Sequence, residues 1–485
     1  MAGQLDLSQI SLDRSGALPL ADQVSSAIER GIEAGAIDQN SRLPTTRELA
    51  AALGINRGTV QAAYRRLQER GLVSGRVGSG TVVRGRPARH RRALHVEDLL
   101  SRRAWALPEE APLPVHSPVV ADFSRLAPDE RFFPLEEFTR TVAYAWSRRR
   151  DLWLYAPPLG LEELRTEISR RLADSGILRS ADEILVVSGA QQGLDLLFRT
   201  FTDPDDVVAV ESPTYSGALA LARVSGVALL PLPVDEHGPD PRPLLQRSAR
   251  LVYVMPERQN PTGVTSSEER RAALLEAAAS AGALVIEDGF EEPEPGRLPL
   301  AARDPERTVW LGTLSKDLVP GFRIGWIAAS RPVIERLARL KKATDFQTPV
   351  PLQAAVAAFL KAGADRKARA SRAEEVLQRA ATAAAALSEH LPETRWWGGE
   401  GSNPLFWLHL PDGLSGRHVA EAAAARGVVV SPGQDFDPKG QDRPNVRLSV
   451  SRVERRDIEP GIARLGQAVN EVRSAARGAH AAPVV

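Results

Sequence analysis

The sequence predicts a small helical domain that ends in a β-hairpin, followed by a large α/β domain that carries a smaller α+β part at its C-terminal end. The chain has 485 residues, about three times the length of an average domain of about 150 residues. Its formal net charge of +1 is unevenly spread, because residues 1–92 carry +6 and the remainder carries −5. From residue 119 onward, seven short apolar runs alternate with helical patterns, which predicts a mostly parallel sheet covered on both faces.

The composition excludes several classes of protein. Hydrophobic residues make up 43% and charged residues 25%, as in ordinary soluble globular proteins. No run of about 18 apolar residues predicts a membrane span, and the first residues do not have the pattern of a secretory signal. The chain has no cysteine, which rules out disulfides, thiolate metal sites and a cysteine nucleophile. We therefore expect a cytoplasmic protein without a metal site.

Periodicity, proline content and charge divide the chain into five segments. A Pro-rich linker, charged at both ends and with at most one short helix near residues 96–105, separates the basic domain from the rest. The predicted boundaries are residues 1–84 for the basic domain, 85–118 for the linker, 119–339 for the large domain, 340–478 for the smaller subdomain and 479–485 for a disordered tail.

The basic domain contains a pair of short capped helices. Thr45 with Glu48 three residues later forms the pattern of a capping box, and Gly54 supplies a C-terminal stop. Asn56 is the N-cap of a second helix that runs to Gly71. Two such helices separated by three or four residues predict a helix-turn-helix, preceded by an amphipathic helix and followed by a hairpin wing.

This arrangement points to DNA, because the first residues of the second helix are placed to enter a major groove. An arginine can hold guanine and a glutamine can hold adenine, while a glycine-rich turn can approach the minor groove. The alternative is a helical domain whose arginines are only solvated. The candidate DNA-binding residues are Arg47, Arg57, Gly58, Thr59, Gln61, Arg76, Gly78, Ser79 and Gly80.

The region resembles the winged helix-turn-helix of GntR-type regulators over its whole length, RLPTTRELAAALGINRGTVQAAYRRLQERGLVSGRVGSGTVV. In that family, the residues that match Arg47, Arg57, Thr59 and the wing glycines contact operator DNA. The resemblance therefore implies double-stranded operator DNA as a partner.

In the large domain, the run TLSKDLVPGFRIGW places Lys316 after a strand, with Ser315 before it and Arg323 seven residues later. An amine can form a Schiff base with an aldehyde, while a hydroxyl and an arginine can bind an attached phosphate. Taken alone, the same lysine could be an ordinary surface residue.

Other polar residues follow neighbouring strands of the predicted sheet. Asp288 ends a strand at the crevice where open α/β sheets bind ligands, and a carboxylate there can pair with a pyridine nitrogen. Taken alone, it could equally cap a loop. Asn260 offers an amide to a ring hydroxyl, and the backbone of Ala190 and Gln191 opens a helix that suits an anion. Tyr215 follows another strand, where its ring could stack on an aromatic cofactor.

Together, these motifs resemble the fold-type I aminotransferases, which bind pyridoxal 5′-phosphate, over residues 120–475. The resemblance implies that Lys316 forms the internal aldimine, that Asp288 pairs with the pyridine nitrogen and that Asn260 contacts the ring hydroxyl. It further implies a homodimer and the following roles: phosphate binding by Ser315, Arg323, Ala190 and Gln191, contribution of Tyr155 from a second subunit, and binding of an effector carboxylate by Arg447. From its position alone, Arg447 could instead make a surface salt bridge at a strand end.

The combination of the two domains is similar to the MocR/GabR regulators. It implies a regulator that senses an amine, an amino acid or the cofactor itself through aldimine exchange at Lys316. Phe290 stands where the family commonly has a tyrosine, and Arg258 stands where it often has a histidine. Because phenylalanine cannot donate to the ring oxygen, we expect at most slow half-transamination. The alternatives are a working aminotransferase with a DNA-binding head, and a regulator whose pocket binds another ligand without the cofactor.

Overall fold

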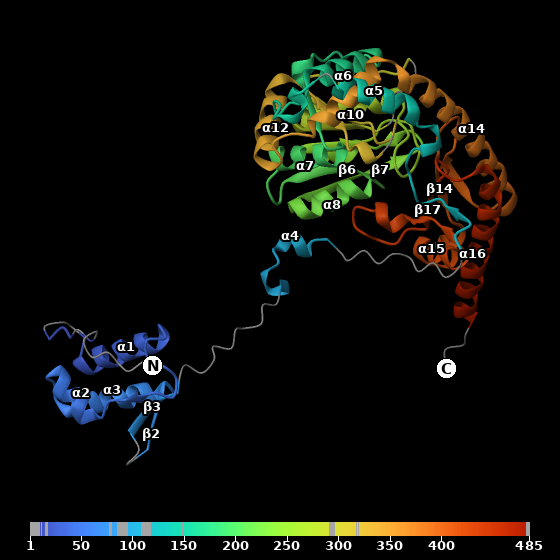
Figure 1. Cartoon of the computed structure of the whole chain (residues 1–485). Coiled ribbons are helices and arrows are strands. Elements are labelled where there is room, and N and C mark those ends of the chain that lie inside the picture. The colour runs from blue at the N-terminus through green and yellow to red at the C-terminus, as the bar shows by residue number, and fades with distance from the viewer. Residues whose placement is uncertain are drawn as a thin grey trace. The chain divides into compact units, whose positions relative to one another are not determined.

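The computed structural model describes residues 10, 12–14, 18–76, 80–84, 96–107, 118–147, 149–290, 296–316, 318 and 320–481. The chain divides into two compact units, Met1–Leu100 and Ser101–Val485, which are considered separately (Figure 1). Within the described part of the chain, no helix is long and apolar enough to cross a membrane.

In its described residues, the first unit has three α-helices and a three-stranded antiparallel sheet in the order β1-β3-β2. Its elements are α1 (Leu20–Glu33), β1 (Arg42–Leu43), α2 (Thr46–Leu53), α3 (Arg57–Glu69), β2 (Val73–Arg76), β3 (Gly80–Val83) and, at its end, the short η2 (Val96–Leu99). The apolar faces of the three helices share one core, which includes Val24, Ile28, Leu49, Val60 and Leu67. This arrangement confirms the predicted helix-turn-helix with a hairpin wing; strand β1 was not predicted.

Local chemistry places the two central helices as the sequence predicts. The Thr45 hydroxyl accepts a hydrogen bond from the Glu48 N–H at 3.2 Å, and the Glu48 carboxylate accepts one from the Thr45 N–H at 2.8 Å. Gly54 ends α2 with a φ of 58°, a left-handed conformation that glycine adopts without steric cost. The Asn56 side chain caps α3 by accepting from the Gly58 N–H at 2.8 Å.

The second unit is built on an eight-stranded sheet in the order β5-β12-β11-β10-β9-β6-β7-β8. The sheet is mostly parallel, as predicted; β12 is antiparallel to both of its neighbours, and β8 is antiparallel to β7. The strands are β5 (Ile184–Val187), β6 (Val207–Ser212), β7 (Ala228–Asp235), β8 (Gly238–Pro239), β9 (Leu251–Val254), β10 (Leu284–Gly289), β11 (Thr308–Thr313) and β12 (Gly325–Ala328).

Helices cover both faces of this sheet (Figure 1). One face packs on α7 (Ala190–Phe201), α8 (Ser216–Ser225) and α12 (Arg331–Thr344). The other packs on α6 (Glu162–Asp174), α10 (Glu268–Ala281) and α13 (Val350–Lys361). Helix α4 (Arg102–Trp105) contacts α8. The other shorter or more peripheral elements are η3 (Glu130–Phe132), α5 (Leu135–Ser147), η4 (Asp151–Trp153), η5 (Ala181–Glu183), α9 (Arg242–Gln246), α11 (Leu300–Arg303) and η6 (Pro320–Phe322).

The C-terminal part has its own core between long helices and a four-stranded sheet in the order β13-β14-β17-β16. Its elements are α14 (Ala364–His390), β13 (Arg395–Gly398), β14 (Leu405–His409), η7 (Pro411–Gly413), α15 (Gly416–Ala425), β15 (Val428–Val429), β16 (Ser431–Pro432), η8 (Gly433–Phe436), β17 (Asn445–Ser449) and α16 (Arg455–Ala481). Strand β4 (Ala121–Asp122) pairs with β15, so Ala121 and Phe123 belong to this C-terminal core.

Packing divides the second unit at places other than the predicted boundaries. Residue 340 lies inside α12, and α13 buries Val356 and Phe359 in the core of the large sheet, so the separate C-terminal core begins only in α14. Helix α16 continues to Ala481, and the first three residues of the predicted disordered tail are therefore helical. The alanine-rich end of this helix favours its continuation. Residues 482–485 lie outside the described residues.

Candidate functional site

Lys316 follows β11 and lines a small cleft of about 60 Å³. The lysine Nζ donates a hydrogen bond to the carbonyl oxygen of Leu126, a residue 190 positions earlier in the chain. Arg258, Arg372 and Ser402 also line the cleft, and they come from the loop after β9, from α14 and from the loop before β14. The amine therefore lies where the large domain, the C-terminal part and the segment that precedes α5 meet.

Asp288 lies on β10 and shares one face of the sheet with Tyr253 on the neighbouring strand β9. Tyr253 pairs in register with Ile286, and Asp288 is two residues further along β10, hence on the same face. The phenol of Tyr253 donates to Asp288 Oδ2 at 2.6 Å. The other carboxylate oxygen, Oδ1, is buried and has no hydrogen-bond partner among the described residues. One oxygen is thus held by the protein, while the second remains available to a donor.

The pKa of Asp288 is raised to about 6. Burial raises it most strongly, while the hydrogen bond from Tyr253, the positive charge of Lys316 and the Phe290 N–H all lower it. Asp288 is therefore predominantly ionised at neutral pH, although its side chain is only 7% exposed. Such a carboxylate can accept a hydrogen bond from a protonated ring nitrogen and keep its own negative charge.

The residues expected to bind a phosphate lie around the start of α7. Gly189 precedes this helix with a φ of 86°, and no side chain caps the helix N-terminus. Arg323 lies over Gly189 so closely that a Cβ added to the glycine would be 2.6 Å from Arg323 Nη2. The Leu314 N–H donates to the Ile324 carbonyl at 3.0 Å. Because Leu314 precedes Ser315 and Ile324 follows Arg323, this hydrogen bond joins the two backbone segments that carry Ser315 and Arg323. Ser315 Oγ is buried and unpartnered among the described residues.

Tyr215 and Gln191 lie beside the same helix terminus. Burial raises the pKa of Tyr215; the charge of Asp288 raises it further, whereas the charge of Arg323 lowers it. The Tyr215 hydroxyl is therefore close enough to both Asp288 and Arg323 for their charges to shift its pKa. Gln191 Nε2 donates to the Gly217 carbonyl at 3.0 Å, which ties α7 to the first turn of α8.

Arg447 and Asn260 are in direct contact although they are 187 residues apart. Arg447 Nη1 donates to Asn260 Oδ1 at 3.0 Å, and Nη2 donates to Ser431 Oγ at 3.1 Å and to the Ser124 carbonyl. The arginine is 6% exposed, its guanidinium lies 4.9 Å from the Phe436 ring centroid, and burial lowers its pKa to about 10. The surface salt bridge considered as an alternative does not match this buried position.

Tyr155 does not line the cleft of its own chain. It is 87% exposed, and its ring centroid lies 6.1 Å from that of Phe346. The sequence-based role, in which this residue contributes to the site of a second subunit, needs such an exposed position. Of the predicted cofactor- and effector-binding residues, Lys316 alone is among those that line the cleft.

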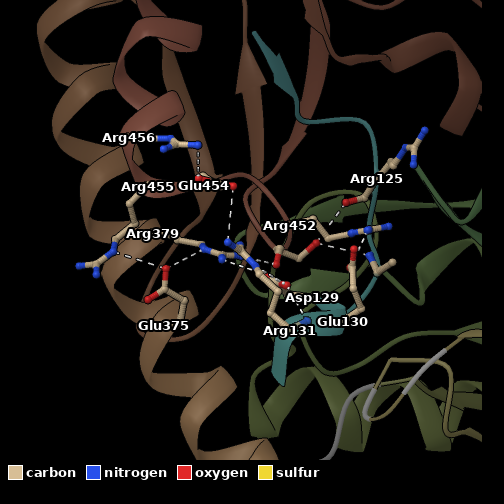
Figure 2. Close-up of polar contacts among 12 residues, drawn as sticks. Arg125, Asp129, Glu130, Arg131, Glu375, Arg379, Arg452, Glu454, Arg455 and Arg456 are labelled. Atoms are coloured by element: carbon tan, nitrogen blue, oxygen red, sulfur yellow. Dashed lines mark hydrogen bonds and ion pairs between the residues drawn. The ribbon is translucent and has the colours of Figure 1, made fainter. Parts of the chain in front are cut away.

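A lead-in segment, residues 121–133, contacts Lys316 through the Leu126 carbonyl. This segment is held by an ion-pair network (Figure 2). Asp129, which is 4% exposed, pairs with Arg379 of α14 at 2.7 Å and with Arg131 at 2.6 Å. Arg379 is also buried, and its Nη1 donates to the Ser451 carbonyl at 2.6 Å. Because Leu126 lies three residues before Asp129, this pair fixes the carbonyl that Lys316 contacts.

Sequence reasoning missed three functional neighbours: Tyr253, the carbonyl of Leu126 and the Asp129–Arg379 pair. Tyr253 left a signal, because a single hydroxyl stands in the otherwise apolar run LVYV of a central strand. The contact at Leu126 uses a backbone carbonyl and leaves no signal in the sequence. Arg379 lies 250 residues from Asp129 in an arginine-rich helix, where nothing distinguishes it from its neighbours.

In the first unit, the candidate DNA-contacting residues lie in the first turn of α2, at the start of α3 and in the wing. Arg47, Arg57 and Gln61 have exposed side chains, and Arg57 Nε donates to Thr46 Oγ1 at 3.4 Å. Gly58 and Thr59 occupy the first turn of α3. In the wing, Arg76 ends β2 and pairs in register with Gly80, whereas Gly78 and Ser79 lie outside the described residues.

Two protein families match this chain. Residues 20–83 match the gntR family of bacterial regulatory proteins, and residues 129–465 match aminotransferase class I and II. The chain is 30% identical to the uncharacterized HTH-type transcriptional regulator YisV of Bacillus subtilis, over 94% of this chain and 97% of that protein. It is also 30% identical to the probable rhizopine catabolism regulatory protein MocR of Rhizobium meliloti, over 73% of this chain and 74% of that protein.

Solved aminotransferases share the fold of the second unit. The α-aminoadipate aminotransferase LysN of Thermus thermophilus, solved with N-(5′-phosphopyridoxyl)-L-leucine, is 27% identical, with a TM-score of 0.70 over 79% of this chain and all of that one. Both halves of the chain thus have relatives, and full-length regulators combine them in the same order. The chain belongs to the GntR-type transcriptional regulators that carry an aminotransferase class I and II domain, as MocR-family regulators do.

Proposed function

We propose that this regulator binds pyridoxal 5′-phosphate at Lys316 and changes its DNA binding when an amine, an amino acid or the cofactor itself is exchanged there. The observation that carries the proposal is the Asp288 carboxylate. One of its oxygens is held by Tyr253 at 2.6 Å, and the other is buried without a partner. A buried acceptor of this kind is costly unless a ligand supplies the missing donor.

The remaining residues fit such a cofactor. The buried, unpartnered Ser315 Oγ and the uncapped N-terminus of α7 offer donors to a phosphate, with Arg323 beside them. Asn260 reaches the site through its contact with Arg447, which suits a substrate carboxylate. When bound, the cofactor supplies an aldehyde for amines and an electron-withdrawing ring.

The chain's own residues favour sensing over turnover. Phe290 is 8% exposed and packs in the apolar core on one face of the sheet, so no hydroxyl from this position reaches the ring oxygen. The Lys316 amine contacts the lead-in segment, which follows the linker directly in the chain. A cofactor bound through Lys316 would engage the nitrogen that makes this contact, and exchange with an incoming amine would free it again. The attachment of the chain that leads toward the DNA-binding unit would therefore differ between the two states.

The assembly proposed with this function is a homodimer. Trp146, Trp153, Tyr155 and Phe346 are exposed aromatic residues; the first two rings lie 6.2 Å apart and the last two 6.1 Å apart. Exposed apolar clusters of this kind mark interaction surfaces. A second copy would cover them and bring Tyr155 to the partner's site. Sedimentation of the cofactor-loaded chain at micromolar concentration tests this, and a monomer would contradict it.

The test of the cofactor is the absorption spectrum of the full chain before and after borohydride reduction. We expect a yellow protein with reducible cofactor in the wild type and in Lys342→Ala, an exposed lysine on α12, but not in Lys316→Ala. A wild-type chain that takes up no cofactor when it is added would refute the proposal and favour a pocket for another ligand.

The test of sensing combines DNA affinity with product analysis over a panel of amines and amino acids, with 2-oxoglutarate or pyruvate as acceptor. We expect at least one amine to change both the spectrum and the DNA affinity, while steady production of a keto acid stays negligible. Sustained turnover above roughly 1 per second would instead support a working aminotransferase.

A further inference from the structure

A charged side chain stands at a core position of α12. Ile334 and Leu337 are buried in the core that α12 shares with α7. Lys341, four residues after Leu337 and on the same side of the helix, is fully buried as well. Burial lowers the pKa of its amine, and a lysine is almost never buried in this way unless it is paired. Because an apolar residue would fill this position at a lower desolvation cost, the lysine indicates a role other than packing.

Lys341 forms a closed cluster with two polar side chains. Its Nζ donates to the two carboxylate oxygens of Asp345, at 2.9 and 2.8 Å, and to Gln192 Oε1 on α7 at 3.2 Å. Gln192 Nε2 donates to Asp345 Oδ2 at 2.5 Å. Asp345 is the C-terminal cap residue of α12, and its N–H donates to the Lys341 carbonyl at 3.0 Å. The three side chains are thus fixed by one another and by the end of a helix.

Gln192 reaches from this cluster to the turn that precedes α7. Its Oε1 also accepts a hydrogen bond from the Ser188 N–H at 2.7 Å. The carbonyl of Ser188 accepts a hydrogen bond from Arg323 Nη2 at 3.2 Å. Because the Gln192 oxygen faces two donors and its nitrogen faces a carboxylate, the amide has one favourable orientation. The cluster therefore holds the turn through the N–H of Ser188, while Arg323 holds it through the carbonyl.

This contact leaves the start of α7 open to an anion. An ordinary N-cap side chain accepts hydrogen bonds from N–H groups in the first turn of its helix. Gln192 instead accepts from Ser188, which lies before the helix, and no side chain caps the helix N-terminus at Gly189. The first N–H groups of a helix have no partner within it, so they remain available to a ligand. The cluster thus fixes the turn without occupying the donors that a phosphate needs.

We propose that Gln192, Lys341 and Asp345 are positioning residues that hold the Ser188–Gly189 turn in the shape that binds the phosphate of the ligand. The three residues act through the backbone of Ser188 and need no contact with the ligand. Binding groups must be held within about 0.5 Å of their productive positions, which the residues around them provide. The inference rests on the proposed function for the identity of the ligand, and it adds the residues on which affinity for the phosphate group depends.

The first test compares pyridoxal 5′-phosphate with pyridoxal, which has the same aldehyde and ring but no phosphate. Absorption titrations of the full chain give both affinities. We expect Gln192→Met and Lys341→Met each to weaken binding of pyridoxal 5′-phosphate at least tenfold and binding of pyridoxal less than twofold. Lys342→Met, at the exposed neighbouring lysine, is the matched control and should behave as the wild type. Equal weakening of both ligands, which a merely structural role predicts, would overturn the inference, as would unchanged affinities.

The second test does not depend on the cofactor. On the cofactor-free full chain, hydrogen exchange is measured in the peptide that contains Ser188, and calorimetry measures binding of inorganic phosphate. We expect Gln192→Met to speed this exchange and to weaken phosphate binding at least tenfold each, and Lys342→Met to change neither.

Unchanged exchange and unchanged phosphate binding in Gln192→Met would overturn the inference even if Lys316 carries cofactor. Faster exchange and weaker phosphate binding, in a chain that fails the borohydride experiment, would support the inference and overturn only the proposed cofactor. A wild-type chain that binds neither pyridoxal 5′-phosphate nor inorganic phosphate would overturn both.

Discussion

Replacing Tyr253 with phenylalanine removes one hydroxyl and leaves Asp288 without its only side-chain donor among the described residues. The residue is fully buried on β9, so the substitution changes no surface charge and little volume. The hydrogen bond lowers the pKa of Asp288, which burial has raised to about 6. Without it, the carboxyl group takes up its proton at a higher pH.

The magnitude follows from the difference between hydrogen bonds to charged and neutral acceptors. Hydrogen bonds to a charged group contribute about 1.5–3 kcal/mol and neutral ones about 0.5–1.5 kcal/mol, so the ionised form of Asp288 loses roughly 1.4 kcal/mol more. Its pKa then rises by about one, to roughly 7. Because the ring nitrogen needs the ionised carboxylate, cofactor affinity should fall about fivefold at pH 6 and remain nearly unchanged at pH 8.5.

The assay is an absorption titration of the full chain with pyridoxal 5′-phosphate at both pH values. Tyr144→Phe, at an exposed tyrosine of α5, serves as the matched control, and Asp288→Asn should weaken binding at both pH values without this pH dependence. An affinity of Tyr253→Phe that matches the wild type at pH 6, or falls equally at pH 6 and 8.5, would refute the assigned role of the phenol.

Three further predictions concern DNA, the lead-in segment and pH. Arg57→Ala should cost about 1–3 kcal/mol of operator-binding free energy and relax specificity at one base position. Arg70→Ala, at the far end of α3, should have neither effect. Gel-shift titrations over a set of operator variants measure both, and equal effects of the two substitutions would reject α3 as the recognition helix. Arg379→Met should lower the free energy of unfolding by up to about 3 kcal/mol, because the buried Asp129 loses one of its two arginine partners and keeps only Arg131. The double variant with Asp129→Asn should lose less than the sum of the two single variants. Denaturant unfolding measures all three, and additive losses would contradict the pairing. Burial raises the pKa of Glu211 to about 8, so its protonated form stabilises the cofactor-free fold and this stability is lost as the pH rises through about 8. Glu211→Gln should therefore flatten the dependence of the free energy of unfolding on pH between pH 6 and 8. An unchanged slope would argue against Glu211 as its origin.

The sequence by itself determined the features whose causes lie within a few residues. The helix caps at Thr45, Gly54 and Asn56 depend on side chains and backbone no more than four positions apart, and the structure has them where they were predicted. Strand identity followed from runs of apolar residues, since a strand buried on both faces has no polar alternation. Lys316 and Asp288 could be named because the first stands in a short motif after such a strand and the second at the end of one.

Tertiary structure alone decided which of these residues meet. Tyr253 reaches Asp288 because β9 and β10 are parallel neighbours in one register, and a register shifted by one residue would turn the phenol to the opposite face. The contacts of Lys316 with Leu126 and of Arg379 with Asp129 join residues 190 and 250 positions apart. Such contacts depend on how complete helices and sheets pack, which the local sequence around either partner does not specify. The sequence therefore determined the chemical groups of the site, whereas the packing of distant elements determined their partners, because hydrogen bonds and ion pairs form only between atoms that the whole fold brings within about 3 Å.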